Sequence, residues 1–211
     1  MVKYNVLYHA SIRIEYNGQI IYFDPFNVGK NYNDADIIFI THSHYDHYSV
    51  EDIKKVECDK THYVMPLSIK NQIKYPIENK IMFVEPDKSY EISGIKFDAV
   101  FAYNKIKLFH RKSSNWLGYV LILDNERYYI MGDTDENKDV LNVKADYIFI
   151  PIGGTYTFDA KEGASYINKV SPKVAIPTHY GKMINSKKDT IDVFLSKTNK
   201  NIKVDVQLKE D

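Results

Sequence analysis

Residues 41–49 read THSHYDHYS and place His42, His44, Asp46 and His47 within six positions. The chain has 7 histidines, so this one stretch holds three of them. The run just before it, DADIIFI, is mostly apolar, which is typical of a short strand buried on both faces. When no thiolate is at hand, imidazole and carboxylate groups are the usual ligands of first-row metals. The stretch therefore predicts a metal centre at the carboxyl end of a buried strand.

The spacing of these side chains predicts two binding points. His42 and His44 are two residues apart, so they point the same way on an extended segment. Asp46 and His47 come after a turn, and a short bend can aim two groups at one point and two at a neighbouring point. This is the layout of a two-metal site, in which the ions lie about 3.5–4 Å apart. The alternatives are an exposed polar loop and a structural zinc site, although closed structural sites usually recruit cysteine.

Strands with a few helices are expected around this stretch. Residues 4–8 and 11–16 are β-type runs, and QIIYFDPF gives a third strand that ends at Asp24-Pro25. The Asn-Gly pair between the last two is the strongest short hairpin signal. Ser49 followed by Asp52 predicts an N-cap and a short helix. Further strands are expected within residues 61–66, 80–86, 94–103, 118–133, 145–154, 173–181 and 202–208, helices at 159–169 and 186–196, and a loop at 104–116.

The β-rich runs contain an internal repeat. The run IEYNGQIIYFDP precedes ADIIFITH, and the run LILDNERYYIMGDTD precedes ADYIFIPIGG. Each reads as a hairpin, an aspartate and then a buried strand that follows Ala-Asp. The spacing from Asp24 to Asp133 is almost the same as the spacing from Asp36 to Asp146. We therefore expect two similar β-rich halves packed face to face.

Composition narrows the classes of protein. The chain has 211 residues, 44% of them hydrophobic and 27% charged, which is ordinary for a globular protein with a real core. The formal net charge is zero, so no large positive field is available to hold DNA or RNA, and we expect no nucleic-acid partner. Cys58 is the only cysteine, which fits a reducing compartment. No leader is visible and no apolar run approaches the roughly 20 residues that span a bilayer, so we expect a cytoplasmic protein without membrane association.

The stretch THSHYDH resembles the His-x-His-x-Asp-His signature of the metallo-β-lactamase superfamily, and the similarity covers nearly the whole chain. The resemblance implies an α/β (α+β) fold, the four-layer αββα sandwich of that family, and a single hydrolase domain over residues 1–211. The segments GDTD, PIGGTYT and PTHYG are most similar to small prokaryotic metal-dependent hydrolases near the ascorbate-6-phosphate lactonase-like branch. A small-molecule substrate is therefore expected, and a homo-oligomer is allowed because small members of this fold often associate.

The resemblance also implies a ligand set. Asp133 in GDTD is similar to the bridging aspartate of the family, and His179 in PTHYG is similar to its late histidine. Asp24 in YFDP resembles an early aspartate that supports the metal loop. Zinc, one or two ions per chain, is the default for such ligands, and manganese or iron is chemically allowed. The implied ligands are His42 and His44 for the first metal, Asp46, His47 and His179 for the second, and Asp133 between them.

One position departs from the family pattern. The family normally supplies a third histidine to the first metal, and this chain has Asn104 at the expected place in VFAYNKIKLFHRK. Asn104 could bind weakly through its amide oxygen, or His110 could reach in from its loop. Alternatively the first site is weak and the enzyme works with one metal at the second site. We favour a weakened first site that Asn104 or water completes.

These residues predict a metal-dependent hydrolase. Metal-bound hydroxide would attack an ester, a lactone or a phosphoester of a small molecule. Asp46 would orient or deprotonate the water, and Asp24 would hold the cluster loop in shape. Tyr103 or His110 would stabilise the charge that develops. The competing functions are a nuclease or phosphodiesterase of the same fold and a non-catalytic metal-binding module.

Two further positions have open roles. His9, in YHAS, would either contact substrate near the metal pocket or be a hydrogen-bonded histidine of the core. Gly153-Gly154 would let the backbone pass close to another group, such as the substrate.

Overall fold

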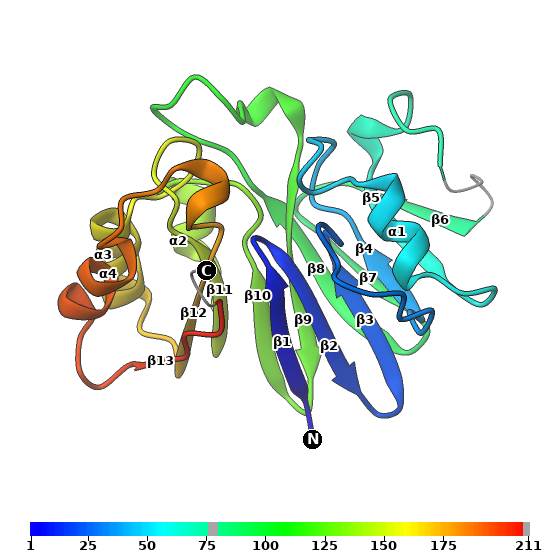
Figure 1. Ribbon diagram of the computed structural model, residues 1–211, viewed down its shortest axis with the longest axis horizontal. Helices are drawn as coiled ribbons and strands as arrows, with labels where there is room; N and C mark the ends of the chain where they lie inside the picture. The colour runs from blue at the N-terminus through cyan, green and yellow to red at the C-terminus, as the bar shows by residue number, and fades with distance from the viewer. Residues whose placement is uncertain (76–79, 209–211) are drawn as a thin grey trace. The chain divides into compact units, whose positions relative to one another are not determined.

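The structure is a computed structural model that describes residues 1–75 and 80–208 (Figure 1). The chain divides into two compact units, Met1–Glu85 and Pro86–Asp211. Among the described residues, each unit is built on one β-sheet, of six strands in the first unit and seven in the second. The expectation that residues 1–211 form a single hydrolase domain stays a prediction.

The sheet of the first unit runs in chain order from edge to edge. Its first three strands pair antiparallel, and each later strand pairs parallel to the one before it. The carboxyl ends of β3, β4 and β5 therefore lie at the same edge, where ligands of parallel sheets usually bind. The strands are β1 (Lys3–Tyr8), β2 (Ser11–Tyr16), β3 (Gln19–Phe23), β4 (Ile37–Phe39), β5 (His62–Pro66) and β6 (Ile81–Val84).

Local sequence accounts for the placement of these strands. Asn17 and Gly18 have φ of 50° and 79°, and they form the predicted two-residue turn between β2 and β3. Strand β4 is fully buried, as its apolar run predicts for a strand between two parallel neighbours. Helix α1 (Val50–Val56) begins at the predicted N-cap, where the Ser49 side chain accepts a hydrogen bond from the Asp52 amide. The stretch 41–48 is thus held between a buried strand and a capped helix.

The sheet of the second unit repeats this order behind one additional edge strand, β7. Strands β8, β9 and β10 pair antiparallel, and the strands after β10 pair parallel. The carboxyl ends of β10, β11 and β12 again share one edge. The strands are β7 (Lys88–Ile92), β8 (Ile95–Phe101), β9 (Leu117–Leu123), β10 (Glu126–Ile130), β11 (Tyr147–Pro151), β12 (Val174–Thr178) and β13 (Lys203–Val204).

Helices cover one face of the second sheet (Figure 1). They are α2 (Lys138–Asn142), α3 (Ala160–Val170) and α4 (Thr190–Lys197), and short 3-10 turns lie at Leu67–Ile69, Lys112–Ser114 and Lys182–Ile184. Helix α3 starts with the predicted capping box of Asp159 and Glu162. Its apolar face packs with Phe194 of α4 against Ile148 and Ile150 of β11, and these residues form a buried core.

Some elements differ from the sequence expectation. Strand β7 was not expected because three of its five residues are exposed and it lies at the sheet edge, so its hydrophobic alternation is weak. Helix α2 has five residues, too few to show a helical period. The last helix begins at Thr190 rather than at residue 186, and the final strand is confined to two residues. Within residues 1–75 and 80–208, no helix has the length and apolar character needed to cross a bilayer.

Candidate metal centre

Asp24 ties together the two ends of the loop that carries the histidine cluster. Its carboxylate accepts hydrogen bonds from the Thr41 amide at 2.8 Å and from the Thr41 hydroxyl at 2.6 Å. The other end of the loop meets the same carboxylate, because His47 Nδ1 lies 2.7 Å from Asp24 Oδ2. Asp24 is 1% exposed, so these bonds form away from water. One buried carboxylate therefore fixes both ends of the loop between β4 and α1.

Asp24 also sets which nitrogen of His47 carries the hydrogen. Burial raises the pKa of the Asp24 carboxyl, and the electrostatic attraction and hydrogen bond of the nearby His47 ring, together with the bonds from Thr41, oppose this rise. A ring nitrogen that faces a carboxylate donates to it, so the hydrogen of His47 lies on Nδ1. The lone pair of Nε2 is then the one that can coordinate a metal.

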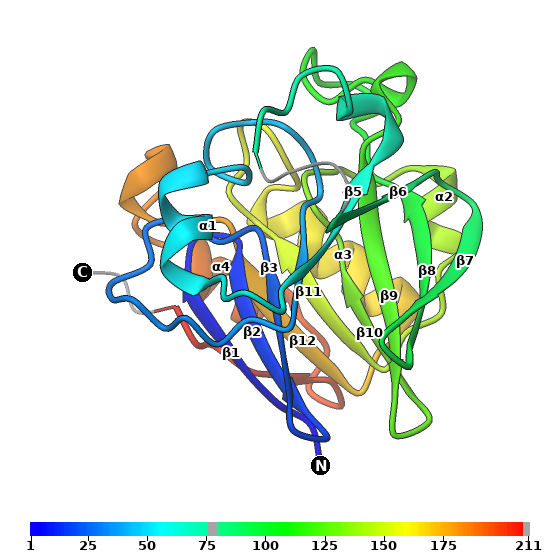
Figure 2. The same ribbon diagram turned by 90° about the vertical axis from the view of Figure 1, so that its right-hand side faces the viewer.

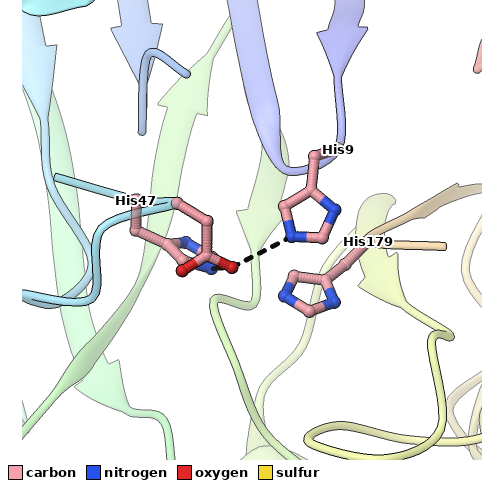
Figure 3. A group of neighbouring side chains, drawn as sticks. His9, His47 and His179 are labelled. Atoms are coloured by element: carbon pink, nitrogen blue, oxygen red, sulfur yellow. Dashed lines mark hydrogen bonds and ion pairs between the residues drawn. The ribbon is translucent and has the colours of Figure 1, made fainter. Parts of the chain in front are cut away.

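Other donors of the first unit gather around the same loop. Potential ligand atoms of His9, Asp46 and His47 lie within 4.8 Å of one another. The closest of these contacts joins His9 Nε2 to Asp46 Oδ2 at 3.2 Å (dashed line in Figure 3). Potential ligand atoms of His42 lie within 4.8 Å of those of His44 and also of those of His47. We call these five side chains the first donor group, and His9, whose role the sequence left open, joins it from the turn after β1.

The second unit has a donor group of its own. His110 Nε2 and His179 Nε2 both lie 3.2 Å from the same oxygen, Oδ2 of Asp133. All three side chains are buried, with no residue more than 4% exposed. Two imidazoles and a carboxylate that converge on one point away from water are the ligand types of a zinc, manganese or iron site. We call His110, Asp133 and His179 the second donor group.

The backbone at several donor positions is unusual. His9, His110 and His179 have φ of 52°, 57° and 54°, in the left-handed region that only a few per cent of non-glycine residues adopt, with Asn, Asp and His enriched among them. Asp24 has φ of 44°. Every other described non-glycine residue with positive φ is Asn, Asp or Ser. Backbone strain of this kind collects at functional sites, where surrounding structure holds it in place.

Gly153 makes room for His179. A Cβ added at Gly153 would lie 2.0 Å from Ile184 Cδ1, 2.3 Å from the His179 carbonyl oxygen and 3.2 Å from His179 Nδ1. Only glycine therefore allows the loop after β11 to pass this close to the residue that follows β12. The sequence predicted a close approach at Gly153-Gly154, and its partner at Gly153 is the His179 backbone and ring.

Asn104 lies beside His110 with its amide orientation fixed. Its Nδ2 donates to the Tyr156 carbonyl oxygen at 2.6 Å and lies 3.3 Å from His110 Nδ1. In this arrangement His110 Nδ1 accepts, so the hydrogen of the ring lies on Nε2. Among the described residues, Asn104 Oδ1 is buried and has no hydrogen-bond partner. A buried amide oxygen left in this state is available to a cation or a donor from outside the chain.

The segment around Asn104 is positioned by residues that the sequence analysis missed. Thr134 Oγ1 and Asn137 Nδ2 donate to the Tyr103 carbonyl oxygen at 2.8 Å and 2.9 Å. Asp135 Oδ1 accepts from the Lys105 amide at 2.7 Å. The stretch that follows β10, GDTDEN, therefore supplies Asp133 and also holds the backbone on both sides of Asn104. The sequence did offer a signal for these residues, because Thr134, Asp135 and Asn137 are polar and directly follow the implied ligand Asp133.

The Tyr103 side chain takes part in different contacts. Burial, and then a hydrogen bond to Asp139, raise the pKa of the Tyr103 phenol. The Lys112 ammonium lies 5.1 Å from the centre of the Tyr103 ring. Neither neighbour belongs to the second donor group. The role expected for Tyr103 at a developing charge stays a prediction that its present contacts do not support.

The chain is similar to known proteins over most of its length. A family model described as a β-lactamase superfamily domain matches residues 4–179. A UPF0173 metal-dependent hydrolase of Thermococcus onnurineus is 30% identical over 195 residues, which cover 85% of each chain. A solved structure described as a metal-dependent hydrolase of Parabacteroides distasonis has a TM-score of 0.83 at 26% identity, over 98% of this chain and 92% of that one.

A more distant structure supports the same architecture. A Zn-dependent hydrolase of the metallo-β-lactamase superfamily from Thermotoga maritima has a TM-score of 0.65 at 22% identity, over 98% of both chains, which shows a shared fold. The expected fold class, mixed α/β with two β-sheets, is confirmed. The family model spans most of the sequence, and the relative from Thermococcus onnurineus matches 85% of it. The chain therefore belongs to the metallo-β-lactamase superfamily.

Proposed function

We propose that this chain is a metal-dependent hydrolase and that each donor group supplies metal ligands. The observation that carries the proposal is the pair formed by Asp24 and His47. A ligating histidine in proteins almost always donates its second ring N–H to a carboxylate or carbonyl, and here the buried Asp24 accepts that bond at 2.7 Å. A buried histidine whose Nδ1 donates to a carboxylate has its Nε2 directed for metal coordination, a feature that a histidine packed in the core does not need.

The donor chemistry suits zinc, with manganese or iron as alternatives. The first donor group offers imidazole nitrogens and the Asp46 carboxylate, and the second offers the His179 imidazole and the Asp133 carboxylate, which His110 Nε2 approaches as a hydrogen-bond donor. Within each group no cysteine contributes, which is more typical of a catalytic site than of a closed structural one. A bound metal of this type lowers the pKa of coordinated water to about 7 and so supplies a nucleophile at neutral pH.

The protein's own residues hold and orient the reacting groups. Asp24 keeps the loop and His47 in one position. The Asp46 carboxylate, 13% exposed at its side chain, lies beside His9 and can accept a proton from an attacking water. The unpartnered oxygen of Asn104 is the atom we assign to the position where the family has its third histidine. His110 keeps its hydrogen on Nε2, so it serves as a hydrogen-bond donor rather than as a third ligand.

The substrate we propose is a small-molecule ester, lactone or phosphoester. The zero net charge disfavours a nucleic-acid substrate, since such binding needs a positive field along the phosphate backbone. Membership near the ascorbate-6-phosphate lactonase-like branch remains a prediction, as do a cytoplasmic location and association into a homo-oligomer.

Metal content tests the proposal directly. We expect purified protein to keep one or two zinc or manganese ions per chain after dialysis, measured by elemental analysis. His47→Ala should lose at least one ion and its hydrolytic activity towards a panel of esters, lactones and phosphodiesters. His62→Ala is the matched control, because His62 is exposed on β5 and lies outside both donor groups. Protein that binds no added metal would contradict the proposal, and protein that binds metal but hydrolyses nothing would favour a non-catalytic metal-binding module.

Substitution of Asn104 tests the assignment of the weakened ligand. Asn104→His should raise the bound metal towards two ions per chain, because imidazole is a stronger ligand than an amide oxygen. Asn104→Leu should lower it, since it removes the buried oxygen. Equal metal content in all three proteins would show that Asn104 takes no part in binding, and circular dichroism would verify that each variant is folded.

A further inference from the structure

The loop of residues 104–110 extends beyond the strand ends of the second unit, between β8 and β9 (Figures 1 and 2). Asn104 and His110 close its neck, because the Asn104 amide donates to the His110 carbonyl oxygen at 2.7 Å and their side chains meet at 3.3 Å. His110 also belongs to the second donor group. The loop is therefore a projection that starts and ends at the candidate site.

The polarity of this loop is the reverse of what solvent exposure predicts. Ile106 and Leu108 are 86% and 80% exposed. Lys107 between them is held inward with its side chain 22% exposed, where its ammonium donates to the Thr157 carbonyl oxygen and lies 3.2 Å from Glu162. A surface loop ordinarily turns its lysine to water and its apolar side chains to the protein. Here Ile106 and Leu108 are exposed, and Lys107 between them is held inward, while Lys105 beside them is exposed.

The exposure of these apolar side chains does not result from a loosely held loop, because several contacts fix residues 104–110 to the unit. The Lys105 amide is bonded to Asp135 at 2.7 Å, next to the neck. The ring of Phe109 packs edge to face on Tyr156, with ring centres 5.0 Å apart and planes at 82°. The Tyr156 carbonyl oxygen in turn accepts the bond from Asn104. Both flanks and the middle of the loop are thus tied to the unit, while the apolar side chains at its tip stay in water.

These side chains form a local cluster rather than random exposure. Ile106, Leu108, Phe109 and Tyr156 are 86%, 80%, 51% and 37% exposed and are joined through one loop and one ring contact. The other exposed large apolar residues among those described are separated along the chain. Isolated exposed apolar residues need no explanation, but a cluster of them marks a binding surface.

We propose that the 104–110 loop is a specificity element that binds an apolar alkyl or aryl group of the substrate. The inference rests on the proposed hydrolase function and narrows it to esters or lactones that carry such a group. The occupant we assign is the substrate because the loop neck consists of Asn104 and His110, so a group bound at the tip is a few residues from the donors. The inward anchoring of Lys107 leaves Lys105 as the one exposed lysine of the loop, fewer basic groups than a surface that binds anionic lipid carries.

A homologous series of alkyl hydroxamates measures the contact. The hydroxamate head binds metal in every member, and only the tail, from one to seven methylenes, changes. We expect the dissociation constant of the zinc-loaded protein, measured by calorimetry, to fall by about two- to fourfold for each methylene that reaches the loop. The slope against tail length reports the loop, and the intercept for the shortest member reports the metal.

Two variants separate the loop from the rest of the protein. In the double variant Ile106→Ser with Leu108→Ser, the slope should fall to near zero because polar side chains replace the apolar surface. Leu195→Ser is the matched control, since Leu195 is 44% exposed on α4 and outside the loop, and it should keep the slope of the original protein.

The outcomes distinguish the inference from the function on which it rests. If no hydroxamate binds zinc-loaded protein, the metal centre itself fails and the inference fails with it. If the series binds but the double variant keeps the original slope, the loop has no role in recognition although the metal centre stands. Loss of self-association in the variant by sedimentation, or loss of binding to phosphatidylcholine vesicles, together with an unchanged slope would assign the loop to a second copy or to a membrane and overturn the proposal.

Discussion

The two units of this protein repeat one arrangement of strands but differ in where they carry chemistry. Strands β1 to β6 and strands β8 to β13 both begin with three antiparallel strands and continue with parallel ones. Ser49 and Asp159 cap the helices that follow β4 and β11, and each stands ten residues after the last paired residue of β4 or its counterpart in β11. The connecting loops are thus equal in length.

The content of these two loops is opposite. Residues 40–48 carry four of the five donors of the first unit, whereas residues 150–158, IPIGGTYTF, contain no histidine, acidic residue or cysteine. The donors of the second unit instead follow β8, β10 and β12. In place of donors, the loop after β11 has Gly153, which gives His179 its space. The repeated strand arrangement determines where the loops leave each sheet. Which of these loops carries the donor residues differs between the two units.

The aspartates that follow β3 and β10 show this difference at single residues. The sequence repeat aligns Asp24 with Asp133, but by sheet register the counterpart of Asp24 is Met131, because each is the first residue after the last β3–β4 or β10–β11 pair. Asp133 lies two residues further from its strand. Asp24 is close enough to its own sheet to bind Thr41, while Asp133 reaches past the strand to two histidines. Similar positions therefore give a supporting role in one unit and a ligand role in the other.

Removal of the ligand carboxylate should have the largest effect. Asp133→Asn keeps the shape of the side chain but removes the charge that both His110 and His179 approach. We expect hydrolytic activity to fall by more than about 100-fold, beyond the loss typical of a supporting residue, and excess metal should not restore it. Activity at several metal concentrations measures this, and full recovery with excess metal would contradict the ligand role.

The supporting carboxylate should have a smaller and reversible effect. Asp24→Asn weakens the bond that fixes the His47 ring, so the dissociation constant for metal should rise by about 10- to 100-fold. Excess metal should restore most of the activity, in contrast to Asp133→Asn. A metal titration of both variants side by side decides the comparison, and identical titration curves would show that the two aspartates share one role.

The first donor group could be predicted from the sequence more completely than the second. Four of its members stand in six consecutive positions, so their chemistry is visible without a fold. The members of the second group are separated by up to 69 residues between His110 and His179, and only the family resemblance singled out Asp133 and His179. The assignment of Asn104 and His110 needed hydrogen-bond geometry, since the orientation of an amide depends on which carbonyl it meets.

The strands were predictable for a related reason. Buried parallel strands such as β4 and β11 are continuous apolar runs, and Asn-Gly or Asp-Asn pairs indicate tight hairpins. The edge strand β7 and the five-residue α2 carry no such signal, because each is stabilised by its neighbours rather than by its own pattern. Gly153 was noticed as a glycine, but its partner is fixed only when β11 and β12 are paired.

Gly153→Ala tests whether the loop after β11 serves to make room for His179 rather than to supply a metal ligand. The added Cβ would meet the His179 carbonyl oxygen at 2.3 Å, so the backbone must move and carry His179 with it. We expect the free energy of unfolding to fall by about 1–3 kcal/mol and metal to bind more weakly. Gly29→Ala is the control, because a Cβ there meets nothing within 4 Å. Equal urea midpoints for the two variants would rule out the tight contact.

The smallest expected effect concerns two aspartates that do occupy equivalent positions. Asp36 Oδ2 accepts from the Ile20 amide at 2.7 Å, and Asp146 Oδ2 accepts from the Arg127 amide at 2.9 Å, at the start of β3 and of β10. Each substitution, Asp36→Ala or Asp146→Ala, should lower the free energy of unfolding by about 1 kcal/mol, the usual net contribution of such a bond. Urea unfolding at pH 7 measures both. A large loss of unfolding free energy for one variant and none for the other would show that the two aspartates are not equivalent.

Acid should remove the contribution of Asp146. Burial opposes ionisation of Asp146, but the Arg127 amide and the Lys173 ammonium outweigh burial and lower the pKa of the carboxyl. A lowered pKa in the folded state stabilises the protein above the ordinary aspartate value of about 3.9, and this stability disappears as the pH falls through the folded-state pKa. The difference in unfolding free energy between the original protein and Asp146→Ala should therefore be constant near neutrality and shrink below about pH 4. A difference that stays constant down to pH 3 would mean that the backbone bond, and not the charge, accounts for the whole effect.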